Sequence, residues 1–253
     1  YFREKFGVES CVAYNVDSFG HNGGLPQILC KSGYKYYVHF RPTPDDDARL
    51  PSGLYTWRGV DGSEVIACRP VLGHYCTDSD QAANKARQGL DLIRRDSHDE
   101  VCFWGVGDHG GAASERELSE LRDLIHSCKD IEIRHSHPEA FLNGLNGSVE
   151  PLPVHEGDLQ RCFTGCYTSG AFLKRSYRTA EGLMAQAERL SALAEYHAGM
   201  RYPKSELESA WKRLLFVQFH DILAGSSSEA GMQDGMEWLS CCRAAARKIR
   251  LRA

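Results

Sequence analysis

The stretch YNVDSFGHNGG, residues 14–24, decides how the first half of the chain is interpreted. The apolar run VESCVAYNV at residues 8–16 predicts a strand that ends at Asp17. A simple loop needs no Phe-Gly-His turn followed by Asn and two glycines. In parallel β/α folds, functional side chains collect just beyond the carboxyl ends of strands. The stretch therefore places Asp17 where a catalytic or metal-binding acid is expected.

Length and composition favour a globular α/β protein. The chain has 253 residues, of which 42% are hydrophobic, enough for one large domain or for a domain with a smaller helical partner. Its formal net charge is −4 and its charges of both signs are interspersed, which argues against nucleic acid and against an anionic membrane surface as partners. No apolar stretch reaches the roughly 18 residues of a membrane span. A neutral or small ligand fits this composition best.

The ten cysteines are dispersed, apart from Cys162-x-x-x-Cys166 and an adjacent pair near the end. This pattern favours buried, reduced thiols in a cytoplasmic protein. A metal or redox pair at Cys162 and Cys166 is the alternative, although the spacing is not the Cys-x-x-Cys of zinc ribbons. The chain opens without Met and inside an amphipathic stretch, so we expect it to be a fragment of a longer protein.

The first 142 residues alternate strand-like and helical segments, as expected of a parallel sheet with crossover helices. Gly, Pro and Asn are frequent between 143 and 158, which places a domain boundary there. We therefore predict domains at 1–142 and 143–253, the second a bundle of helices at 168–197, 204–222 and 228–250. In the first domain we predict helices at 25–33, 82–95 and 114–128, strands at 35–42, 100–107 and 131–135, and a hairpin at 54–70.

Four polar residues fall at predicted element ends rather than on faces: Asp17, Arg41, Asp108 among glycines, and His220 at the end of an apolar helix. Singly, each has a simpler explanation. An Asp after a strand or beside glycines is usually a cap or turn residue, an Arg a salt-bridge partner, and a His an interior hydrogen-bonding residue. Together, two carboxylates, a cation and an imidazole are the groups that metal-assisted glycoside hydrolysis needs.

At these residues the chain resembles the α-mannosidases of glycoside hydrolase family 38. The resemblance rests on segments that follow the family's order along nearly the whole chain: NVDSFGHNGGLPQILCKSGY, YTWRGVDGSEVIACRP, GVGDHGG, GCYTSGAFLKRSYRTAE and AWKRLLFVQFHDILAGSSS. It implies a partial β/α barrel of the glycoside hydrolase 38/57 type, followed by the three-helix middle domain of the family.

The resemblance also implies roles for single residues. Asp17 matches the catalytic nucleophile, which in this family is also a zinc ligand, and Arg41 matches an arginine beside it. Asp108 matches the general acid/base, His220 matches a second zinc ligand, and Tyr75 is similar to a residue that lines the sugar subsite. The implied protein is a Zn²⁺-dependent retaining α-mannosidase that hydrolyses terminal α-mannosyl residues of oligosaccharides or glycans. A homo-oligomer is compatible with the sequence.

The chain departs from the family pattern in two respects, and two other functions are alternatives to this interpretation. The family's other zinc ligands lie in an early His-x-Asp segment that this chain lacks, and its C-terminal β-domain is absent too, so we expect the chain alone to be inactive. One alternative is a catalytically silent mannose-binding or scaffold homologue. The other is a metal-dependent polysaccharide deacetylase, for which His135-x-His137 is the only close histidine pair, with both rings on one face of a predicted strand.

Overall fold

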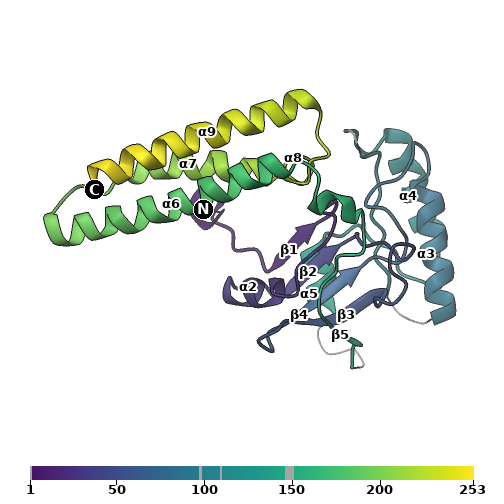
Figure 1. Ribbon diagram of the computed structural model, residues 1–253. Helices are drawn as coiled ribbons and strands as arrows, with labels where there is room; N and C mark the ends of the chain where they lie inside the picture. Colours follow the sequence, from purple (N-terminus) through teal and green to yellow (C-terminus); the bar gives the residue numbers. More distant parts are fainter. Residues whose placement is uncertain (1, 97–98, 109, 146–150) are drawn as a thin grey trace. The chain divides into compact units, whose positions relative to one another are not determined.

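The computed structural model describes residues 2–96, 99–108, 110–145 and 151–253. The chain forms two compact units, Tyr1–Cys162 and Phe163–Ala253 (Figure 1). The first unit continues past the boundary expected after residue 142, because the strand β5, Val154–Glu156, pairs with the sheet of that unit.

The first unit is built on a mixed five-stranded sheet with the strand order β1-β2-β4-β3-β5. β1 is parallel to β2, and β2 is parallel to β4. β3 and β4 form the antiparallel hairpin expected around the Asp61-Gly62 turn, while β5 runs parallel to β3. The strand bounds are Val12–Asn15 for β1, Tyr36–His39 for β2, Gly53–Arg58 for β3 and Glu64–Arg69 for β4.

β2 lies between β1 and β4 in the sheet, and all four of its residues are buried. Successive side chains of a strand point to opposite faces. Tyr37 accordingly packs in a cluster with Leu29 of α2, whereas Val38 packs with Leu142 of α5. The helices of this unit are α1 (Phe2–Phe6), α2 (Leu25–Lys31), α3 (Ala82–Asp96), α4 (Glu115–Ser127) and α5 (Pro138–Gly144). The Ser114–Glu117 capping box expected at the start of α4 is present.

Two predicted strands, 100–107 and 131–135, are wrong, since neither segment forms a strand. An apolar run becomes a strand only when a neighbour pairs with its backbone. In the first segment, the Lys85 ammonium instead binds the carbonyl of Phe103, and only an isolated bridge joins Thr77 to Val106. The structure also contains β5, which the sequence pattern did not indicate.

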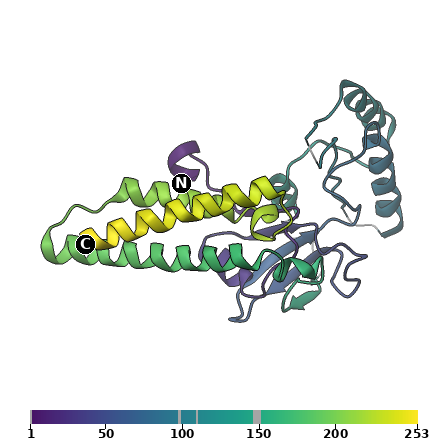
Figure 2. The ribbon, with the colours of Figure 1, turned by 45° about the horizontal axis from the view of Figure 1, so that its top comes forward.

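The second unit is a bundle of three long helices, α6 (Ala171–Ala198), α7 (Lys204–Val217) and α9 (Glu229–Arg252), which run alongside one another in Figures 1 and 2. A 3₁₀ turn, η1 (Thr164–Tyr167), precedes α6, and the short helix α8 (His220–Leu223) follows α7. One apolar cluster, in which Met184 and Leu214 are fully buried, joins the helices. No helix among the described residues combines the length and the apolar composition needed to cross a bilayer.

The neighbours Leu214 and Leu215 provide a test of the bundle core, because Leu214 is 0% exposed and Leu215 is 53% exposed. Leu214→Ala leaves a cavity, and we expect it to lower the free energy of unfolding by about 2–5 kcal/mol. Leu215→Ala is the control and should cost less than about 0.5 kcal/mol. Denaturant unfolding followed by circular dichroism measures both; equal losses would contradict the packing described here.

Candidate active site

The register of the two parallel strands β1 and β2 brings Asp17 and Arg41 together. Asn15 pairs with His39 across these strands. Asp17 and Arg41 each lie two residues past the end of their strand. The Arg41 Nε donates a hydrogen bond to the Asp17 Oδ1, forming an ion pair whose side chains are 17% and 19% exposed. Burial works against the guanidinium charge, but the hydrogen bond and charge of Asp17 outweigh it and raise the pKa of Arg41.

Two further groups contact the Arg41 guanidinium. Its central carbon lies 5.9 Å from the centroid of the Phe19 ring, a cation–π arrangement. The buried thiol of Cys162 also interacts with Arg41; burial and the neighbouring Asp46 raise the pKa of this thiol to about 11. Cys166 belongs to the second unit, and all ten cysteines, which lie among the described residues, are free.

Tyr75 links Asp108 to this pair. The Tyr75 hydroxyl donates to the Asp108 Oδ1 at 3.1 Å. Burial, the hydrogen bond to Asp108 and the charges of both Asp17 and Asp108 raise the pKa of Tyr75 to about 12. The phenol is therefore protonated at neutral pH, and both carboxylates lie near enough to act on it electrostatically. The structure thus brings Asp17, Arg41, Tyr75 and Asp108 into one region of the first unit.

Aromatic packing holds the Tyr75 segment against the end of β2. The ring of Phe40, which directly precedes Arg41, lies 5.8 Å from that of Tyr75 and 5.0 Å from that of Phe103, edge-to-face in both cases. Phe40 is only 5% exposed, so this contact belongs to the core. The position of Tyr75 is consequently tied to that of Arg41.

Lys85 of α3 joins the two segments that carry Tyr75 and Asp108. Its ammonium donates to the carbonyls of His74, Cys76 and Phe103, at 2.5, 3.2 and 2.7 Å. Desolvation lowers the pKa of Lys85. A Lys on a helix usually reaches into solvent, and the sequence pattern gave no indication of this role.

The loop around Asp108 requires glycine. Asp108 is exposed and has a left-handed backbone with φ 71°, which Asp tolerates better than most residues. A Cβ on Gly107 would lie 2.6 Å from the Cβ of Cys76, and one on Gly111 would lie 2.5 Å from the Val106 carbonyl oxygen. The close approach of these backbones explains why glycines surround the acid.

His220 belongs to the second unit, where it begins α8. Its ring packs against the Phe219 ring at 4.3 Å between centroids, and its Nε2 lies 3.8 Å from an Asp221 carboxylate oxygen. The predicted strand pair His135-x-His137 is wrong in its geometry. That segment forms no strand, and the His137 imidazole instead caps the N-terminus of α5 by accepting from Ala140 N–H.

The fit of this chain to zinc is partial. Carboxylate and imidazole donors suit Zn²⁺, which usually takes four ligands. Within the described ranges, no three His, Cys, Asp or Glu side chains form a group that could hold a metal ion. Asp17 and His220 on their own would fill only half of the usual coordination shell, so we assign no catalytic step to the metal.

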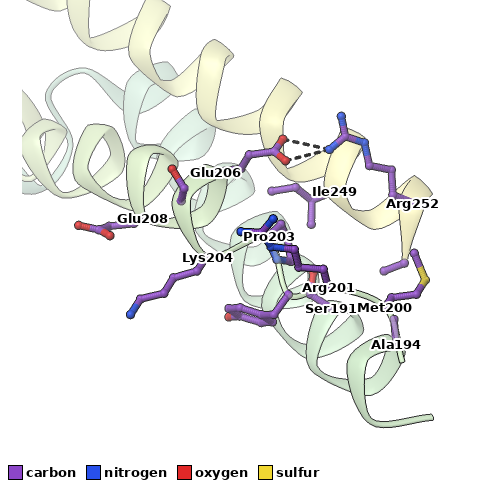
Figure 3. A pocket seen from close by; sticks show the side chains of 13 residues that line it. Ser191, Ala194, Met200, Arg201, Pro203, Lys204, Glu206, Glu208, Ile249 and Arg252 are labelled. Atoms are coloured by element: carbon purple, nitrogen blue, oxygen red, sulfur yellow. Dashed lines mark hydrogen bonds and ion pairs between the residues drawn. The ribbon is translucent and has the colours of Figure 1, made fainter. Parts of the chain in front are cut away.

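A pocket of about 550 Å³ lies in the helical unit where α6 ends, α7 begins and α9 ends (Figure 3). Its rim carries an exposed ion pair in which Arg252 donates to both Glu206 carboxylate oxygens at 2.9 and 3.1 Å. None of the five predicted site residues lines this pocket. The pocket and the constellation around Asp17 therefore share no residue.

Comparison with known proteins assigns the chain to a family. Residues 1–158 match the model of the glycosyl hydrolases family 38 N-terminal domain, and residues 161–252 match that of the alpha mannosidase middle domain. The chain therefore belongs to glycosyl hydrolase family 38. The expected family resemblance and the expected fold, a partial α/β domain followed by helices, are both confirmed.

Among curated relatives, alpha-mannosidase 2C1 of Homo sapiens is 28% identical over 244 residues, covering 93% of this chain and 23% of the relative. The alpha-mannosidase of Saccharomyces cerevisiae is 25% identical over 258 residues, covering 90% and 22%. The crystal structure of an alpha-mannosidase from Enterococcus faecalis V583 superposes with a TM-score of 0.83 at 21% identity, covering 99% of this chain and 30% of that one. The chain thus spans about a quarter of the length of these relatives.

Lys85→Met tests how the Tyr75 and Asp108 segments are joined. The substitution keeps the length of the side chain but leaves three carbonyls without their donor, so we expect a loss of about 1–3 kcal/mol in stability. Hydrogen exchange should accelerate at residues 74–78 and 102–106 in particular. The control is Lys129→Met at an exposed position, which should change neither. Unchanged exchange in the Lys85 variant would contradict the role assigned to it.

Proposed function

We propose that the protein to which this chain belongs is a retaining α-mannosidase that removes terminal mannosyl residues from mannose-containing oligosaccharides or glycans. The observation that carries the proposal is the position of Tyr75 between the two acids. Its hydroxyl donates a hydrogen bond to Asp108, and the charge of Asp17 contributes to its raised pKa. Retaining hydrolysis needs two carboxyl groups about 5–5.5 Å apart on opposite sides of the glycosidic bond. The family membership of the chain supports the choice of mannosides. Its ten free cysteines support the proposal of a cytoplasmic location.

In this mechanism Asp17 is the nucleophile. Its carboxylate attacks the anomeric carbon, and a covalent glycosyl-enzyme forms as the bond to the leaving oxygen breaks. Arg41 binds Oδ1 and keeps the carboxylate from rotating, so that Oδ2 is the oxygen that we assign to the attack. Orientation of a reacting group in this way lowers the entropic part of the barrier.

Asp108 is the general acid and then the general base. Its Oδ1 accepts from Tyr75, and we assign Oδ2 to hold the proton that passes to the departing oxygen. In the second half of the reaction the same oxygen takes a proton from the water that releases the sugar. Tyr75 stays a hydrogen-bond donor throughout, because its raised pKa keeps the phenol protonated.

We further propose that Asp17 and His220 are zinc ligands in the whole protein, where the remaining ligands come from outside this chain. When bound, Zn²⁺ would supply a Lewis acid for the sugar hydroxyls. We expect the whole protein to contain zinc and His220→Ala to lose it, since one imidazole ligand is removed. His197→Ala, at an exposed helical position, is the control. Metal analysis by mass spectrometry measures both; full zinc content in the His220 variant would refute this ligand.

The dependence of the rate on the leaving group of the substrate distinguishes the proposed roles of the two carboxylates. In the whole protein, Asp17→Asn should abolish turnover of every aryl α-mannoside, because no nucleophile remains. Asp108→Asn should slow substrates with poor leaving groups by about 100-fold or more, and substrates with activated leaving groups much less in the glycosylation step, since those need no proton. Rates across a series of aryl α-mannosides measure this difference, with the exposed Asp45→Asn as the control.

The same experiment tests the alternative of a catalytically silent homologue. Mannose binding without turnover by the wild-type whole protein would favour that alternative over the proposed enzyme. Proton NMR of the first sugar released tests retention, because a retaining enzyme releases the α-anomer first. Initial release of the β-anomer would exclude Asp17 as a nucleophile.

A further inference from the structure

Two buried histidines converge on the backbone of Arg41. The His21 Nε2 lies 2.9 Å from the Arg41 carbonyl oxygen, and the His39 Nδ1 lies 3.0 Å from the same oxygen. His21 is 4% exposed and His39 is 0% exposed. Arg41 lies two residues past the end of β2. The two imidazoles therefore bind the same main-chain acceptor just beyond the strand.

The hydrogen-bond chemistry fixes the tautomer of both rings. A carbonyl oxygen only accepts, so the nitrogen that faces it must carry the proton. His21 is then protonated at Nε2, and its Nδ1 accepts from the Tyr37 hydroxyl at 2.7 Å. His39 is protonated at Nδ1, and its Nε2 accepts from the Tyr55 hydroxyl at 2.6 Å. Every nitrogen of both neutral rings has a partner of the correct kind.

Both rings are neutral at physiological pH. Burial is the main cause that lowers the pKa of His21 to about 4 and that of His39 to about 3, against a smaller opposing contribution from the Arg41 carbonyl. The mutual repulsion of the two rings lowers the pKa of His39 further. Neutral imidazoles can donate to the carbonyl without placing positive charge beside the guanidinium.

Three residues of the segment Asp17–His21 contact three different parts of Arg41. The Asp17 carboxylate binds Nε, the Phe19 ring lies near the guanidinium carbon, and the His21 imidazole binds the main-chain carbonyl. Gly20, with φ 148°, allows the chain to turn between the last two. The main chain of His21 is itself held by two 2.8 Å hydrogen bonds to Leu159. The Asp-x-Phe-Gly-His spacing thus places three side chains of one segment in contact with Arg41.

We propose that His21 and His39 are positioning residues: by holding the main chain of Arg41 they direct its guanidinium, and through it the Asp17 carboxylate. We call the set of Asp17, Phe19, His21 and His39 around this arginine the Arg41 clamp. The catalytic consequence rests on the proposed function, but the geometry of the clamp does not. The guanidinium keeps a fixed direction only if both the side-chain end and the main-chain end of Arg41 are held. Without the imidazoles, the carbonyl end loses two of the groups that hold it.

The position of the donor nitrogen gives a crossed test in the whole protein. The amide nitrogen of Gln lies near the Nε2 position of a histidine ring, and that of Asn lies near the Nδ1 position. His21→Gln and His39→Asn therefore keep a donor for the Arg41 carbonyl, whereas His21→Asn and His39→Gln move it away. We expect the second pair to lose about 10- to 100-fold in kcat with little change in KM, and the first pair to retain most of the activity.

This crossed pattern separates positioning from plain stability. All four variants lose an imidazole that accepts from a buried tyrosine, so thermal unfolding should show a loss of stability in each. Only the kinetic loss should follow the position of the donor. Equal kcat within each pair of variants at one histidine would overturn the proposal.

A second measurement needs neither activity nor a variant. Nitrogen-15 NMR of the 253-residue chain should show His21 as the Nε2–H tautomer and His39 as the Nδ1–H tautomer, with the Arg41 Nε–H protected from exchange. The opposite tautomer at either ring, or a freely exchanging Arg41 Nε–H, would overturn the clamp. If the whole protein fails to hydrolyse α-mannosides while these signals are as expected, the proposed function fails and the clamp stands.

Discussion

The ion pair between Arg41 and Asp17 is the interaction on which the rest of the site depends. It arises from the parallel register of β1 and β2, in which Asn15 pairs with His39 and the chain continues two residues past each strand. Because parallel strands present their carboxyl ends at one edge of the sheet, an acid and a base from distant sequence positions meet there. A shift of one residue in this register would turn one of the two side chains to the opposite face.

Core packing extends this constraint to the third functional segment. Phe40 is buried in the cluster that contains β2, yet its ring also contacts Tyr75 and Phe103. Lys85 then ties the Tyr75 and Phe103 segments together through their carbonyls. The hydroxyl that reaches Asp108 is thus positioned by hydrophobic contacts and by the half-buried ammonium of Lys85. Neither of these belongs to the reacting groups.

Much of this arrangement could be predicted from the sequence, because its signals are local. The hairpin at Asp61-Gly62, the capping box at Ser114 and the three long helices each follow from short-range patterns, and the structure contains them. The strand predicted from the apolar run 100–107 is wrong, because strand formation depends on a pairing partner that the run itself does not reveal. The sequence did not indicate the role of Lys85 for a similar reason: the pattern of an amphipathic helix is the same whether its lysine faces solvent or binds main-chain carbonyls.

The two carboxylates differ in environment in the way that the two proposed roles require. Asp17 is largely buried and engaged by a guanidinium whose own main chain is held, so its oxygens have little freedom to turn. Asp108 is exposed, in a glycine-lined loop, and its Oδ1 accepts from a neutral phenol. A nucleophile benefits from fixed geometry, whereas a group that gains and loses a proton in each cycle needs access to water. Environment, rather than chemical identity, therefore supports the proposal that Asp17 attacks and Asp108 transfers the proton.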